Sequence, residues 1–172
     1  MLNYTWKPAT GLDVQNIVNL AEQHFQNEID DIFKPEPNVY SRNITHAIVD
    51  QFFLPPKELI AVCYNDATHD LMAYTWAQGD HRAPWSDDLM VFVKMSHVDL
   101  RLSSALKIRL VTDMIKLWEQ FAALGRVPII CSTTMRRDQT AFMRIHAKLG
   151  YDVRGSFAYK KLNTLQTGLP IP

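Results

Sequence analysis

The chain has 172 residues, of which 47% are hydrophobic and 21% are charged, a composition that excludes a disordered or fibrous protein. The 18 Lys and Arg residues balance the 18 Asp and Glu residues, so no net charge draws the protein to nucleic acid or to an acidic membrane. The length suits one domain with its own core.

The sequence shows neither the pattern of a targeting segment nor that of a disulfide framework. The N-terminus lacks the charged start and apolar stretch of a signal peptide, and no uncharged apolar run reaches the ~18 residues that cross a bilayer. The two cysteines, Cys63 and Cys131, lie in apolar runs and favour free thiols over a disulfide framework. We therefore expect a soluble, cytoplasmic protein without a membrane partner.

The N-terminal third predicts a strand and two helices. The strand is short, aromatic and bounded by a proline, and the first helix follows a threonine cap. Prolines are expected to end each of the two helices. These elements cover residues 4–7, 14–25 and 40–52.

The middle of the chain predicts a group of three strands. Two apolar runs flank a polar turn, and a looser loop over 78–87 leads to a third apolar run. The strands cover residues 59–64, 71–77 and 89–95.

The longest predicted element is a helix over 104–124, in which Leu110, Met114 and Trp118 recur on one face. Serines at its start and a glycine at its end are typical of helix caps. The elements that follow are a strand over 127–132, a helix over 139–148 and a final strand or strand pair over 151–162. We expect a single domain over 1–162 and a loose tail over 163–172.

The order of elements predicts an α/β fold. The long helix must be a crossover that joins parallel strands, which makes 91–95 and 127–132 parallel neighbours. The sheet is then mixed, with helices on both faces. The six histidines show no metal-ligand pairing, so no metal site is expected.

The stretch from Gln139 to Tyr151, which ends in Ile-His-Ala-Lys-Leu-Gly-Tyr, is similar to the "Leu-Tyr-Glu-Lys-Leu-Gly-Phe" helix of the GCN5-related N-acetyltransferase (GNAT) superfamily. The element order resembles that superfamily over nearly the whole chain. The resemblance implies a GNAT-like mixed, mostly antiparallel central sheet with a splayed parallel strand pair, and acetyl-CoA as acyl donor.

The family binds the CoA pyrophosphate at a Gln/Arg-x-x-Gly-x-Gly/Ala turn before the long helix, where bare N–H groups and the helix dipole favour phosphate. Here Ser104 and Leu106 stand where the family has small residues. Simple helix capping by the serines and a surface role for the arginine are the alternatives. The resemblance implies these cofactor-binding residues: Arg101, Leu102, Ser103, Ser104, Ala105 and Leu106 at the turn, Val93 and Met95 along the strand, and Gln139 at the later helix.

His146 occupies the position of the family's Tyr, which protonates the departing CoA thiolate. The alternative is a histidine packed on the helix. Asp88, with Asp87 beside it, is a candidate general base before the strand over 89–95, and solvated carboxylates are the alternative.

Other polar and aromatic residues near the expected cleft carry weaker signals. Residues 132–134, Ser-Thr-Thr, close a strand near the cleft, but no His or Asp spacing marks a nucleophile. Tyr74, Trp76, Trp85 and Phe92 are candidates for an acceptor pocket, with core packing as the alternative.

The resemblance implies an N-acyltransferase in which an amine attacks the thioester directly. The acceptor is a small-molecule or protein amine, and a homodimer is left open. The rival interpretation is a catalytically inactive GNAT-like fold that serves as a structural or protein-interaction module.

Overall fold

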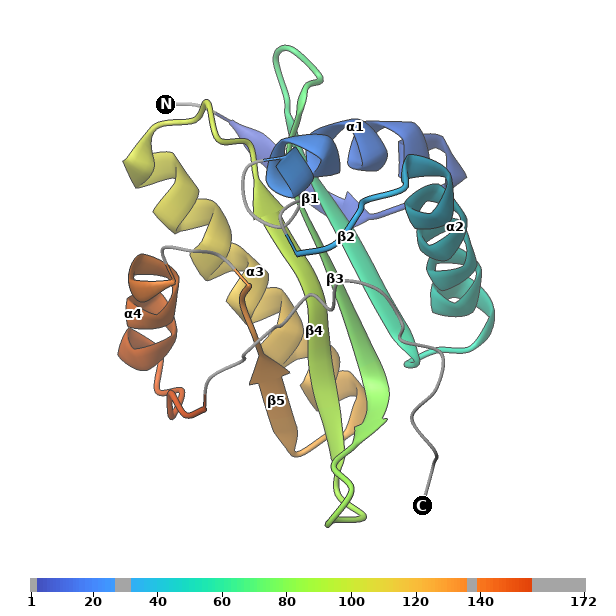
Figure 1. The fold of residues 1–172 in the computed structure, drawn as a ribbon, viewed down its shortest axis with the longest axis vertical. Coiled ribbons are helices and arrows are strands. Elements are labelled where there is room, and N and C mark those ends of the chain that lie inside the picture. Colours follow the sequence, from blue (N-terminus) through green and yellow to red (C-terminus); the bar gives the residue numbers. More distant parts are fainter. Residues whose placement is uncertain (1–2, 27–31, 136–138, 156–172) are drawn as a thin grey trace, which may run out of the picture.

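The computed structural model describes residues 3–26, 32–135 and 139–155. Its strands form one sheet in the order β1-β2-β3-β4-β5, antiparallel except for the parallel pair β4 and β5 (Figure 1). The predicted mixed sheet with a parallel pair is confirmed. The strands are β1 (Tyr4–Pro8), β2 (Glu58–Asn65), β3 (Leu71–Arg82), β4 (Leu89–Val98) and β5 (Ile129–Ser132).

In the described part of the chain, helices cover both faces of the sheet (Figure 1). One buried cluster joins α1 and α2 to Ile60, Val62 and Tyr74 of the sheet, and a second joins α3 and α4 to Val91 and Val93. The helices are α1 (Val14–His24), which follows a 3-10 turn over Gly11–Asp13, α2 (Pro37–Phe53), α3 (Ser104–Gly125) and α4 (Thr140–Lys148).

Two predicted boundaries were wrong in the first half of the chain. Helix α2 begins at Pro37 and not at residue 40, because a proline at the first helical position gives up no intrahelical hydrogen bond. Strand β3 runs on to Arg82, through residues predicted as a loop. Gly79 belongs to this extension because the Pro56 carbonyl passes so close that a Cβ at position 79 would lie 2.5 Å from its oxygen.

The end of the chain also differs from the prediction. Residues 151–155 of the predicted final strand are not in a strand, and residues 156–162 and the tail over 163–172 lie outside the described residues. No helix in the described ranges is long and apolar enough to cross a membrane. Among the same residues, no group of three or more His, Cys, Asp or Glu side chains could hold a metal ion.

Strand β4 carries a bulge at Lys94. Trp76 of β3 pairs with Met95 and the next residue, Ala77, pairs with Val93, so Lys94 is an extra residue between two pairs. Such a bulge bends a strand and increases its twist. The pairing of β4 with β5 ends at the same place, with Val93 opposite Ser132. Beyond this point the two parallel strands separate, as the resemblance predicted.

Candidate functional site: a splayed strand pair and two helix ends

The gap between the second half of β4 and the residues after β5 is called the splay here. Residues 95–98 pair with β3 and not with β5, so the main-chain groups of their other edge face the splay. A cavity of about 80 Å³ opens in it, lined by His24 of α1, by Lys94 and Met95 of β4, and by Thr133 and Thr134 after β5. The splay therefore offers a strand edge that β5 does not cover, beside a small cavity.

The predicted phosphate-binding turn leads from β4 into α3. Ser103 is the N-cap, whose Oγ accepts a hydrogen bond from the Leu106 N–H at 3.4 Å, so it does cap the helix. Ser104 and Ala105 are exposed in the first turn, where backbone N–H groups lack an intrahelical acceptor. Leu102 and Leu106 pack against the core instead. The helix end is therefore lined by small side chains, although the sequence lacks the family's glycines.

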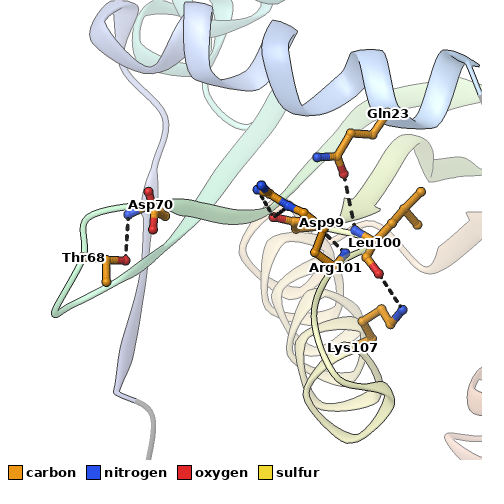
Figure 2. Close-up of polar contacts among 7 residues, drawn as sticks. All are labelled: Gln23, Thr68, Asp70, Asp99, Leu100, Arg101 and Lys107. Atoms are coloured by element: carbon orange, nitrogen blue, oxygen red, sulfur yellow. Dashed lines mark hydrogen bonds and ion pairs between the residues drawn. The ribbon is translucent and has the colours of Figure 1, made fainter.

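Arg101 lies beside this turn and is bound to Asp99 (Figure 2). Its guanidinium donates to both carboxylate oxygens, with Nη2 to Oδ2 at 2.6 Å, and its backbone N–H donates to Oδ1 at 2.9 Å. Lys107 Nζ donates to the Leu100 carbonyl at 3.1 Å, and Gln23 of α1 accepts from the Leu100 N–H. These contacts order the turn, and Arg101 shapes it as well as adding positive charge.

The Asp99 carboxyl shows the electrostatic effect of this pairing. Burial raises its pKa, but the side-chain and backbone hydrogen bonds from Arg101 outweigh burial and hold the pKa below its usual value. Asp99 is therefore ionised at neutral pH and offsets part of the charge of Arg101.

A second cavity, of about 440 Å³, lies between β5, the start of α4 and the segment after α4. Gln139 and His146 line it, as does Ser132. Thr133 and Thr134 line both cavities, so the end of β5 separates the two. The structure thus brings Gln139 and His146 to the strand end where the splay begins.

His146 is 2% exposed and is held at both ring nitrogens. Nδ1 lies 3.0 Å from the Phe142 carbonyl oxygen, and Nε2 lies 3.0 Å from Ser132 Oγ. Burial lowers the pKa of His146, which the hydrogen bond to Phe142 only partly opposes, so the imidazole is neutral at neutral pH. The ring is packed on the helix and also reaches the strand end through Ser132.

Asp88 and Asp87 lie elsewhere. Both are exposed in the connection before β4, where Asp88 Oδ2 accepts from Ser86 Oγ at 3.1 Å and Asp87 pairs with Arg82. Since strands rise about 3.3 Å per residue, Asp88 is roughly 17 Å along the strand from Val93. The structure does not bring Asp88 together with the other predicted site residues.

A polar cluster beside the splay was missed by the sequence interpretation. Glu58 is 6% exposed, and its carboxylate accepts from Trp76 Nε1 at 2.8 Å and from Lys94 Nζ at 3.1 Å. The Lys94 ammonium also lies 4.6 Å from the centroid of the Trp76 ring. Of the other aromatic candidates, Tyr74 is buried in the core and Trp85 is 86% exposed. Only the assembled sheet brings the cluster together, since its members come from three strands.

The cysteines are not activated nucleophiles. Cys63 and Cys131 are free thiols, as expected, and burial raises the pKa of both, that of Cys63 to about 12. Cys131 is only half-buried and not enclosed in the core. Neither thiol is ionised at neutral pH, which fits a reaction without a thiol nucleophile.

Comparison with known proteins rests on structure alone. The sequence matches no protein-family model and no curated protein. The fold is similar to aminoglycoside 6'-N-acetyltransferase AAC(6')-Ih from Acinetobacter baumannii, with a TM-score of 0.66, 15% identity, and coverage of 94% of this chain and 99% of that chain.

Two further solved structures are also similar in fold. Each comparison covers 94% of this chain and 99% of the other chain. Glucosamine-6-phosphate N-acetyltransferase from Arabidopsis thaliana gives a TM-score of 0.68 at 9% identity. AAC(6')-Iy in complex with a bisubstrate analogue, CoA-S-monomethyl-acetylneamine, gives 0.64 at 12% identity. Together with the bulged strand and the splayed parallel pair, these likenesses show that the chain has the fold of the GCN5-related N-acetyltransferase superfamily.

Proposed function

We propose that this protein is an N-acetyltransferase that moves the acetyl group of acetyl-CoA to a small-molecule amine by direct attack. The observation that carries the proposal is that the edge of β4 that β5 does not cover leads directly into the turn and the N-terminus of α3. An extended pantetheine arm has amide groups that can pair with such a strand edge. A pyrophosphate is favoured at a helix N-terminus that presents free N–H groups.

In this proposal the residues have separate roles. The backbone N–H groups of Ser104 and Ala105 hold the pyrophosphate, and the main chain from Val93 to Met95 holds the pantetheine arm. Gln139, at the start of α4, is assigned a further contact with the arm. The thioester then lies near the apex of the splay, where the chemistry is positioning and proton transfer.

The structural neighbours support a small-molecule amine as the acceptor. Two of them are named for such substrates, an aminoglycoside and glucosamine-6-phosphate. A panel of aminoglycosides, amino sugars and simple primary amines is therefore the first set to test, with CoA thiol release as the measured product.

Binding of acetyl-CoA tests the proposal before any acceptor is known. Calorimetry should show binding to the wild type and a loss of at least about tenfold for Ser104→Asp, because its carboxylate repels the phosphates. Ser104→Asn is the matched control: it has the same shape as Asp without the charge and should bind within a few-fold of the wild type. Absence of acetyl-CoA binding to the folded wild type would overturn the proposal in favour of a non-catalytic module. Equal affinity of the Asp and Asn variants would move the phosphate site elsewhere.

A further inference from the structure

Ser132 and His146 form a hydrogen-bonded pair whose direction the structure determines. The Phe142 carbonyl can only accept, so the Nδ1 atom that lies 3.0 Å from it carries the imidazole proton. In the neutral ring Nε2 is then an acceptor, and Ser132 Oγ, also at 3.0 Å, donates its proton to it. The serine hydroxyl is thus already polarised by a base.

The imidazole of the pair is held in place by two aromatic rings and two hydrogen bonds. Trp118 of α3 stacks on it at a centroid distance of 5.9 Å, and Tyr151 meets it edge-on at 5.2 Å. A ring that is 2% exposed and bonded at both nitrogens has little freedom to turn toward a ligand. His146 therefore exchanges protons with a ligand through Ser132 and not directly.

Ser132 has the position that such an exchange requires. It is the last residue of β5 and pairs with Val93, which is where the strands separate. Its side chain is half-buried and lines the larger cavity, which adjoins the splay through Thr133 and Thr134. A thioester at the apex of the splay would thus lie beside the Ser132 hydroxyl.

The geometry points to Ser132 and His146 as a proton shuttle that carries the proton of the acceptor amine to the departing CoA sulfur, an inference that rests on the proposed acetyltransferase function. The neutral amine nitrogen attacks the thioester carbonyl carbon and forms the C–N bond. The proton lost by that nitrogen passes to Ser132 Oγ while the serine proton passes to His146 Nε2. The C–S bond breaks, the thiolate takes the proton of Oγ, and Nε2 returns its proton to Oγ.

The step balances without any other reactant. One N–H bond is exchanged for one S–H bond, the amide and free CoA are the products, and both side chains return to their starting state. The buried imidazolium exists only transiently, and its Nδ1–H keeps the Phe142 carbonyl as a partner. Burial, which lowers the pKa of His146, favours the neutral starting form and the return of the proton to the thiolate.

The test compares kcat and acetyl-CoA affinity across variants at the strand end. Ser132→Ala removes only the hydroxyl and should lower kcat by about 10²–10⁴-fold, the usual contribution of a positioned acid or base, with affinity unchanged. Ser132→Thr keeps a hydroxyl and should recover most of the rate, and Ser41→Ala on α2 is the matched serine control. Tyr151→Phe tests the phenol hydroxyl that also lines the cavity, and whose pKa burial raises to about 12.

A pH profile gives a readout that a structural role of His146 would not move. In the wild type, kcat/KM for the acceptor requires both a neutral amine and a neutral imidazole, so its acidic limb should approach a slope of about two. In His146→Gln, which keeps a polar group, the slope should fall to about one. Nitrogen NMR of the wild type should independently show the Nδ1–H tautomer of this histidine.

The outcomes separate the shuttle from the proposed function. Acetyl-CoA binding with transfer in the wild type, but unchanged kcat in Ser132→Ala, would overturn the shuttle alone. A greater loss in Tyr151→Phe than in Ser132→Ala would also overturn it and make Tyr151 the donor. No binding and no transfer in the folded wild type would overturn the proposed function itself.

Discussion

The two halves of β4 differ in how their edges are used. From Met90 to Val93 the strand pairs with both β3 and β5, and Val91 and Val93 are buried in the core. From Met95 to Val98 it pairs with β3 and not with β5, and its other edge faces the splay. One inserted residue, Lys94, separates the two halves.

In this protein the candidate site thus coincides with a local irregularity within the sheet and not with an added element. The first half of β4 is paired on both sides. The second half has one edge that β5 does not cover, and proteins usually cover such an edge or place charged side chains on it. Side chains on both sides of the sheet hold the bulge in place. Substituting single side chains tests how each half of the strand is held.

The largest expected effect concerns the support beneath the bulge. Trp118 Nε1 donates to Thr75 Oγ1 at 2.8 Å, and Thr75 Oγ1 donates to the Met95 carbonyl at 3.0 Å. Trp118→Ala should lower the free energy of unfolding by about 3–5 kcal/mol, because it leaves a large cavity. Urea unfolding followed by circular dichroism measures the loss. Trp85→Ala, at a side chain 86% exposed, should change it by less than about 0.5 kcal/mol.

The next effect concerns the opposite face of the bulge. Lys94→Met removes the cation that pairs with the buried Glu58 and should cost about 1–3 kcal/mol, because the carboxylate then loses a direct ion pair and keeps the hydrogen bond from Trp76. Lys57→Met breaks the more exposed pair with Asp50 and should leave the unfolding midpoint nearly unchanged. Equal effects of the two variants would mean that the Glu58 cluster does not support the bulge.

The smallest effect concerns the turn at the far end of the open half. The pKa of Asp99 is lowered, so its stabilisation is complete above the unfolded value of about 3.9 and is lost as the pH falls through the lower folded value. Asp99→Asn should therefore flatten the dependence of the unfolding midpoint on pH below about pH 4. Some dependence should remain, because the pKa of Asp13 is also lowered, by bonds from Thr10 and Tyr64 that outweigh burial. An unaltered pH dependence in Asp99→Asn would contradict the role of the pair.

The sequence predicted the elements whose cause is local. The apolar stripe of α3 places Leu110, Met114 and Trp118 in the core, and the crossover length makes β4 and β5 parallel neighbours. The bulge could not be predicted, because it depends on the register between β3 and β4. Gly79 was interpreted as part of a loop, since the close approach of Pro56 that requires a glycine comes from a distant part of the chain.

The arrangement of the candidate site residues could be predicted only in part. The position of His146 on α4 could be read from its resemblance to a motif, but its partner Ser132 is supplied by the packing of α4 beside β5. The turn before α3 was found through its arginine and serines. That Arg101 is bound to Asp99 became clear only from the fold, although Asp and Arg two positions apart could have suggested it.

The bulge at Lys94 bears on how far the sequence of such a strand can vary. A strand edge opened by one extra residue is made of peptide groups, which every residue type except proline presents alike. Side chains along the strand can therefore change while the opening persists. This chain accordingly shares its fold with structures that are 9% and 16% identical to it in sequence. For folds of this kind, the same backbone arrangement is found at low sequence identity.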